Sequence, residues 1–461
     1  MARSVLSNPA SGMLRSIVGR SWWIVAQKGH QRGTFGIAFD AVLGTLAGMS
    51  ELSTTRAVTL YVGALLGPGV LLVPGLAAEI AGPASIVSWL GLLGVSGLLA
   101  VVFSALGRRY PGRSGAAGFA GAAFGPRAER AVAACFLVGA VLGAPVVCLI
   151  GAAYVTQVVG GGLRVTVALA AVLLLAVVAL TASAGQASGA VQLGLVGLLT
   201  AVILVAVVGA LPSARIDNWT PFAPHGWSAI GTAGTVLMLS FVGWEAIAPM
   251  TARLRDAERQ LPRVIALAFS ITSAIYLALA VAVVGALGAR AGSATPVADL
   301  LRIAIGPVGA VVAAIAAVAL TLAATNAYLC GAAELAAELV GPRGRRGLPP
   351  VVAVVGVVLL VPVAVGWVST AQLVVLPTTL FVAVYVAATA AGVRLLSGSA
   401  RLAAALSCAA VGVVLTFAGT AVALPVLVGA VAGWSARRRS FRPADQLTPC
   451  GRAGAPARPI S

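Results

Sequence analysis

The sequence predicts an all-α membrane protein with twelve transmembrane helices. Hydrophobic residues make up 60% of the 461-residue chain and charged residues 9%, with a mean hydropathy of +1.04. A soluble chain carries about a quarter charged residues. Apolar segments of about 17–25 residues, long enough to cross a ~30 Å hydrocarbon core, recur from Arg56 onward. Two of these segments, the first and the sixth, are interrupted near their middles.

Each predicted helix is placed by the centre of its apolar segment. The predicted centres are Gly69, Gly97, Gly143, Leu175, Val202, Phe241, Leu277, Leu320, Leu359, Val384, Leu415 and Val428. Arginines cluster in every second loop, which by the positive-inside rule predicts cytoplasmic N- and C-termini. The net charge of +18 is therefore interpreted as a topology signal rather than a nucleic-acid interface.

The twelve-helix domain is expected over residues 56–435. The preceding residues 1–55 carry no segment long enough to span and are expected to be a disordered cytoplasmic tail. Alternatively they are an upstream extension, with Met49 as the natural start. Residues 436–461 are expected to form a basic cytoplasmic tail. The five cysteines show neither metal-ligand nor disulfide spacing, and we expect no metal and no cofactor.

The first interruption is Gly67-Pro68-Gly69, in the middle of the segment from Val58 to Ile80. Proline cannot donate a hydrogen bond to the preceding turn, and glycine tolerates non-helical backbone angles. The helix should therefore unwind here and leave free N–H and C=O groups. Unpaired backbone at membrane depth is tolerated only where it is buried or lines a cavity.

The second interruption is Phe241-Val242-Gly243-Trp244-Glu245, with Pro249 one turn later. A carboxylate inside the membrane is costly, so Glu245 is a candidate functional residue. The alternative is that Glu245 lies nearer the inner interface and pairs with Arg253 or Arg255.

Broken helices at corresponding places in two halves predict an inverted-repeat transporter. Repeat one would cover about residues 56–211, repeat two about 229–393, and helices 11 and 12 about 402–435. Free amides at the first break suit a carboxylate and free carbonyls at the second suit an ammonium group. Together they predict a clamp for a zwitterion.

Both stretches also resemble a known family. The first break, with Gly67 to Val70 and the following Ala81 to Ser85, is similar to the opening helix of the amino acid–polyamine–organocation (APC) superfamily. The second break, with Glu258 to Arg263 behind it, resembles its sixth helix. The resemblance covers about residues 56–435 and looks closest to the bacterial branch that exports methionine and branched-chain amino acids.

The resemblance implies a LeuT-type 5+5 inverted repeat with broken helices 1 and 6, and a secondary amino acid transporter in the plasma membrane. It implies that first-break amides hold the substrate carboxylate, although Pro68 has no N–H. Second-break carbonyls would hold the amino group, with Phe241 or Trp244 as a gate. The implied substrate-binding residues are Gly63, Leu66, Gly67, Gly69, Phe241, Val242, Gly243 and Trp244.

Some proton-coupled members of the superfamily carry a lysine in the fifth helix. Here Lys28 is the only lysine, so Glu245 or Glu79 would have to carry a coupling proton, because burial can raise a carboxyl pKa toward neutrality. Exchange is an alternative, and so is sodium coupling through Thr321 and Thr325.

Mid-depth polar side chains are few in the segments expected to line the pocket. The exceptions are Gln157, Asn326, Tyr328, Thr378 and Thr379. This favours neutral, apolar amino acids; a cationic amino acid or polyamine permease is the alternative, with Glu245 as counter-charge. Glu334 and Glu338 are expected to face Arg343 and Arg345, and residues 297–305 to form a short outer helix with Asp299 and Arg302 on its wet side.

Other classes of protein fit the sequence less well. A membrane enzyme would need a nucleophile, an acid–base pair or a ligand cluster, and the two histidines, His30 and His225, lie in a tail and a loop. A channel would favour repeated pore-lining patterns over two single breaks. We therefore expect the partners to be an amino acid, a proton and the lipid bilayer, and no nucleic acid.

Overall fold

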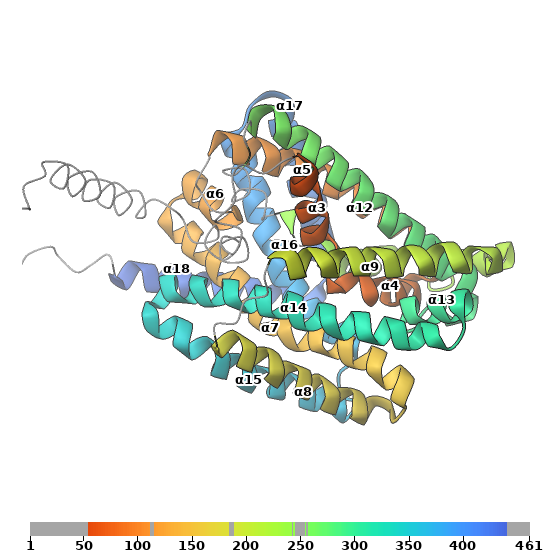
Figure 1. Ribbon diagram of the computed structural model, residues 1–461. Coiled ribbons are helices and arrows are strands. Elements are labelled where there is room, and N and C mark those ends of the chain that lie inside the picture. The colour runs from red at the N-terminus through yellow and green to blue at the C-terminus, as the bar shows by residue number, and fades with distance from the viewer. Residues whose placement is uncertain are drawn as a thin grey trace, which may run out of the picture.

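The computed structural model describes residues 54–110, 115–183, 189–241, 243–244, 254 and 257–439. Within these ranges the chain folds into α-helices joined by turns and short 3₁₀ segments (Figure 1). Each predicted segment centre lies in a helix or at one of the two breaks. This confirms the all-helical fold class.

Nine of the described helical segments are long and apolar enough to cross a membrane. They are Val73–Arg109, Pro126–Val159, Gly162–Ala182, Gly194–Ser213, Arg259–Arg290, Val308–Val340, Pro342–Ala364, Thr370–Leu395 and Gly398–Thr416. Shorter apolar helices cover Gly115–Phe124, Ala229–Ser240 and Gly419–Trp434. The count of twelve spans remains a prediction.

The helices around the two breaks pack as one group. It consists of α3 (Thr54–Leu65), α4 (Val73–Ala81), α5 (Ser85–Arg109), α10 (Ala229–Leu237) and α12 (Ala257–Leu287). A second group lies side by side below it in Figure 1: α7 (Pro126–Val159), α8 (Gly162–Ala182), α14 (Val308–Val340) and α15 (Pro342–Ala364).

The contacts among helices of the first half recur among the helices that follow five predicted segments later in the chain. The equivalent pairs of helices are α3 and α10, α5 and α12, α7 and α14, α8 and α15, and α9 (Gly189–Ala210) and α16 (Thr370–Leu395). The helix α9 touches α3, α12 and α14, and its counterpart α16 touches α10, α5 and α7. Likewise α7 touches α15, and α14 touches α8. Such reciprocal packing is what a two-fold repeat produces.

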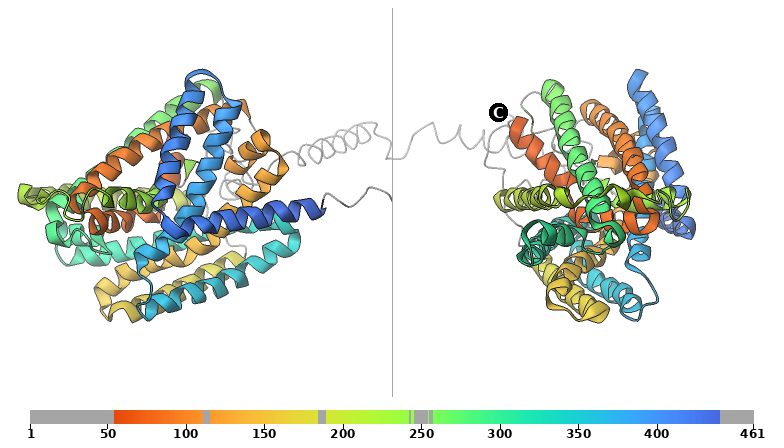
Figure 2. Two further views of the ribbon diagram at one scale, coloured as in Figure 1. Left: turned by 180° about the vertical axis from the view of Figure 1, so that it is seen from behind. Right: turned by 90° about the vertical axis from the view of Figure 1, so that its right-hand side faces the viewer.

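The remaining helices lie against this repeat. The short helix α6 (Gly115–Phe124) contacts α7 and α16, and α17 (Gly398–Thr416) contacts α5 and α16. The last helix, α18 (Ala423–Arg439), runs beside α7, and the left view of Figure 2 shows it crossing α16 and α17.

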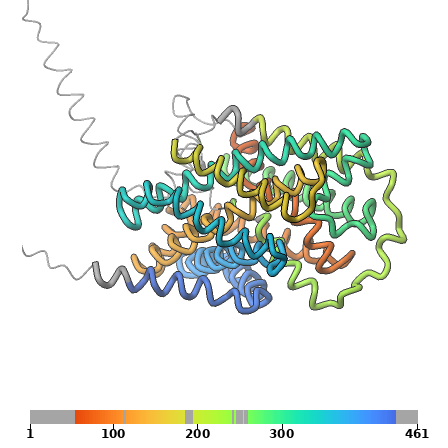
Figure 3. The backbone as a smooth tube through the Cα atoms, turned by 90° about the horizontal axis from the view of Figure 1, so that it is seen from below, coloured from red at the N-terminus to blue at the C-terminus, as the bar shows by residue number. Residues whose placement is uncertain are grey.

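The segment between α9 and α10 covers one end of the bundle (Figure 3). Its Arg215 amide and Asn218 Nδ2 donate to the Gly285 carbonyl, at 3.0 and 2.6 Å. The predicted outer helix is also present at this end as α13 (Pro296–Ile305).

One expectation about α13 was wrong. Arg302 is exposed, but Asp299 is only 8% exposed and accepts a 2.7 Å hydrogen bond from Gln157 Nε2 on α7. The reason is that α13 packs against both α9 and α14, which covers the face that was expected to be wet.

Candidate functional site

The first helix breaks where glycine and proline predict it. The helix α3 ends at Leu65, and a 3₁₀ turn, η1 (Pro68–Leu71), precedes α4. Gly67 lies between them in an extended conformation, with φ −73° and ψ 174°. Within the described part of the chain, the Gly67 and Gly69 amides reach no acceptor. This break therefore presents two free N–H donors.

The second break lies against the first. The helix α10 passes into a 3₁₀ turn, η5 (Met238–Phe241), and Gly243 follows with φ +144°. A Cβ at Gly243 would lie 2.5 Å from the Ala64 carbonyl oxygen, so both the backbone angle and the close approach require glycine. Gly243 also donates a 3.1 Å hydrogen bond to Tyr385 Oη.

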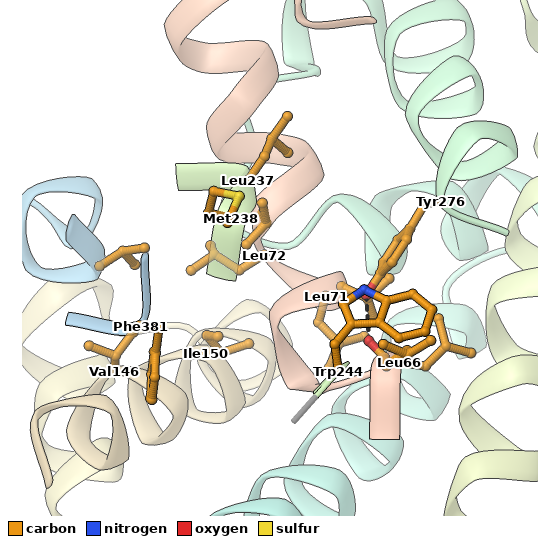
Figure 4. Packing of buried hydrophobic residues seen from close by; sticks show 14 of the residues in the cluster. Leu66, Leu71, Leu72, Val146, Ile150, Leu237, Met238, Trp244, Tyr276 and Phe381 are labelled. Carbon is orange, nitrogen blue, oxygen red and sulfur yellow. Dashed lines mark hydrogen bonds between the residues drawn. The ribbon is translucent and has the colours of Figure 1, made fainter. Parts of the chain in front are cut away.

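One buried phenol holds the two breaks together. The Tyr276 hydroxyl lies 2.7 Å from the Leu65 carbonyl oxygen and 2.8 Å from the Ser240 carbonyl oxygen. Its ring packs on Trp89, with 5.2 Å between centroids. Figure 4 shows Tyr276 and Trp244 on one side of the first break and Phe381 and Val146 on the other.

A cavity of about 60 Å³ opens on the Phe381 side of the first break. This is several times the ~10–15 Å³ that a cavity needs to hold one water, so it has room for more than one. Its described lining comes from Gly67 and η1, from α7, α14 and α16, and from η5 after α10, and none of it is charged. The lining residues are Gly67, Pro68, Gly69, Ala140, Gly143, Ala144, Val146, Val147, Leu239, Ala324, Thr325, Tyr328 and Phe381.

The polar side chains expected near this pocket are mostly engaged elsewhere. Asn326 Oδ1 lies 3.0 Å from Thr181 Oγ1, and Gln157 bonds to α13. The hydroxyls of Thr378 and Thr379 donate to carbonyls of their own helix, at 2.7 and 2.6 Å. Of these expected residues, the cavity is lined only by Tyr328.

The structure separates the implied substrate-binding residues. Gly67 and Gly69 line the cavity. Gly63 faces α9, because a Cβ there would lie 2.6 Å from Val196 Cγ2. Leu66 is 1% exposed, lies beside Trp244 in Figure 4, and is not among the residues that line the cavity.

Trp244 also lies away from the cavity. Its Nε1 donates a 2.9 Å hydrogen bond to Ser96 Oγ on α5. It lines a second cavity of about 10 Å³ with Ser240, Thr272 and Tyr276, a volume close to that of a single water. Of Phe241 the structure describes the backbone at the end of η5, and Val242 and Glu245 lie outside the described residues.

The other coupling candidates are placed as follows. Glu79 is exposed at the end of α4, beside Gly292. Thr321 is fully buried and its hydroxyl lies 3.4 Å from the Val147 carbonyl oxygen, whereas Thr325 lines the cavity.

The expected pairing at the inner end of α14 is confirmed for one carboxylate. Glu334 lies 3.1 Å from Arg345. Because the Arg345 side chain is more than half exposed, this ion pair adds little to stability.

Comparison with known proteins assigns a family. The family model described as "Amino acid permease" matches residues 52–448. The chain is 27% identical over 302 residues to the "Uncharacterized amino acid permease YecA" of Bacillus subtilis, covering 65% of this chain and 70% of that protein. It is 34% identical over 232 residues to the "L-methionine/branched-chain amino acid exporter YjeH" of Escherichia coli, covering 49% and 54%.

A solved structure shares the fold. The crystal structure of MhsT in complex with L-phenylalanine superposes with a TM-score of 0.52 at 16% identity, covering 83% of this chain and 100% of MhsT. The LeuT-type fold implied by the sequence is thereby confirmed.

Proposed function

The chain belongs to the amino acid permease family, a family of multi-pass membrane transporters, and from this premise we propose that it carries neutral, apolar amino acids across the plasma membrane by alternating access. The observation that supports this most is the cavity at the first break. It combines the unpaired amides of Gly67 and Gly69 with a lining that is otherwise almost entirely apolar.

The two amides are the recognition element for the substrate's carboxylate. Backbone N–H groups at the start of a helical turn are natural anion sites, because they lack partners and the turn's dipole is positive there. The η1 turn begins at Pro68, directly between the two glycines. The carboxylate therefore binds at Gly67 and Gly69.

The uncharged lining is the selectivity element. A cationic or acidic side chain moved into this cavity would lose its hydration without meeting a counter-charge among the described lining residues, which costs several kcal/mol. A leucine or methionine side chain instead gains about 0.8 kcal/mol for each buried CH₂ group. The similarity to YjeH, which is named as an exporter of methionine and branched-chain amino acids, supports this selectivity.

We further propose that the carrier works by proton coupling or exchange, with both termini in the cytoplasm. Glu245 remains the candidate proton carrier from the sequence. Glu245→Gln should then abolish accumulation driven by a proton gradient while substrate exchange continues. Accumulation that is unchanged in this variant removes Glu245 from the coupling mechanism.

The substrate proposal is tested by uptake into liposomes containing the purified protein. Labelled leucine, methionine, arginine and glutamate are each offered with and without proton and sodium gradients. Saturable leucine and methionine uptake is expected, with arginine and glutamate at the level of empty liposomes. Arginine uptake without leucine or methionine uptake would overturn the proposed selectivity.

A further inference from the structure

Thr325 has a buried hydroxyl without a partner in the part of the chain that the structure describes. The residue lies on α14, is 2% exposed, and lines the cavity together with Gly67, Pro68 and Gly69. Among the described residues, its Oγ1 reaches no hydrogen-bond partner. Buried polar atoms without a partner are rare and call for an explanation.

Most threonines elsewhere in these helices do not share this feature; Thr272 on α12, which lines the 10 Å³ cavity, is another described threonine without a partner. A threonine in a membrane helix ordinarily donates its hydroxyl to the carbonyl one turn earlier. Six other threonines of this chain do so, at 2.6 to 2.9 Å: Thr156, Thr181, Thr200, Thr378, Thr379 and Thr389. Thr325 leaves that bond unmade, and the residue lines the cavity.

The opposite wall of the cavity lacks one donor. Pro68 occupies the first position of η1, where any other residue would offer an amide. A carboxylate has two oxygens and about four acceptor positions, so the Gly67 and Gly69 amides leave part of it unbonded. Because α14 packs directly against η1, Thr325 and the two glycines border the same space.

We propose that Thr325 Oγ1 donates a hydrogen bond to the carboxylate of the bound amino acid and takes the place of the amide that Pro68 cannot supply. This inference rests on the proposed function, since it needs an amino acid in this cavity. It assigns carboxylate recognition to two parts of the chain, the first break and α14.

The test measures equilibrium binding of labelled leucine to purified protein. Thr325→Val keeps the shape of the side chain but removes the hydroxyl. It should weaken leucine binding about 10-fold or more, because the lost hydrogen bond is to a charged group. Thr325→Ser keeps the hydroxyl and should bind within about three-fold of the wild type. Thr200→Val on α9, whose hydroxyl bonds to the Val196 carbonyl and which does not line the cavity, is the control and should bind leucine like the wild type.

Competition by leucinol, which has no carboxylate, identifies the group that Thr325 contacts. Leucinol should compete equally well in the wild type and in Thr325→Val. An equal loss for leucine and leucinol, or unchanged leucine binding in Thr325→Val, overturns the inference. A loss seen only in sodium-containing buffer also overturns it, since Thr325 would then ligate sodium.

A double variant tests the exchange of roles directly. Pro68→Ala adds one N–H to η1, so Pro68→Ala combined with Thr325→Val should bind leucine more tightly than Thr325→Val alone. Equal or weaker binding would show that the hydroxyl does not replace that amide. If the wild type binds no amino acid at all, the proposed function itself fails, and this result is distinct from every outcome above.

Discussion

Enlarging Gly143 to alanine should shift the selectivity of the cavity toward smaller amino acids. Gly143 lines the cavity from α7, away from the carboxylate-binding break. A Cβ at this position would meet only Pro377 Cβ, at 3.8 Å, which is ordinary contact. Alanine also suits a helix better than glycine does, by about 0.5–1 kcal/mol. The Gly143→Ala variant should therefore fold, with a smaller cavity.

The expected magnitude follows from the size of the cavity. A methyl group takes up a substantial part of a cavity of about 60 Å³. A leucine side chain that filled this space would then be overpacked, at a cost of about 1–3 kcal/mol. This corresponds to about 5- to 150-fold weaker binding of leucine. Alanine, which does not fill the space, should keep its affinity within about two-fold.

Inhibition of labelled alanine exchange in liposomes measures both affinities. Unlabelled leucine and unlabelled alanine are titrated against the same flux in wild type and Gly143→Ala. The control is Gly94→Ala on α5, where a Cβ meets nothing within 4 Å and which does not line the cavity. Unchanged leucine inhibition, or an equal loss for leucine and alanine, would refute the assignment of this wall to the substrate side chain.

Two further predictions concern the contacts that hold the site in place. Tyr276→Phe removes the donor shared by the Leu65 and Ser240 carbonyls and should cost about 1–3 kcal/mol of stability, seen as a lower unfolding temperature in detergent. An unfolding temperature equal to that of the wild type would argue against this bridge. Asp299→Ala leaves the Gln157 amide without its acceptor and should destabilise by a similar amount, while Asp299→Asn, which keeps an oxygen, should be closer to wild type. Equal unfolding temperatures for these two variants would contradict the role given to this bond.

Both breaks could be predicted because their causes are local. Proline lacks an N–H and glycine accepts unusual backbone angles wherever they occur in a chain. The Gly67-Pro68-Gly69 stretch alone therefore predicts unwinding, and the φ of +144° at Gly243 fits the same logic. The spacing of five apolar segments between the breaks then indicated the repeat.

The side chains around the cavity could not be predicted in the same way. The spanning helices are apolar on every face, so the sequence has no polar stripe to show which face of α7, α14 or α16 meets η1. Phe381 was not assigned to the site for this reason, and Trp244 was placed there although it bonds to Ser96. The small residues Ala140, Gly143 and Ala144 were the available signal for a wall that leaves room for a ligand.

The most direct test of substrate binding at the first break is substrate counterflow, measured in the wild type and in a variant with a larger side chain at this break. Liposomes containing the protein are loaded with unlabelled leucine, and entry of labelled leucine is followed in wild type and Gly67→Leu. A Cβ at Gly67 meets nothing within 4 Å, so the larger side chain extends into the cavity while the helices remain packed. We predict transient accumulation of labelled leucine with the wild type, and none with Gly67→Leu protein that has inserted into the liposome membrane. Accumulation by Gly67→Leu, or flux through the wild type that needs no leucine inside, would contradict a carrier that binds its substrate at this break.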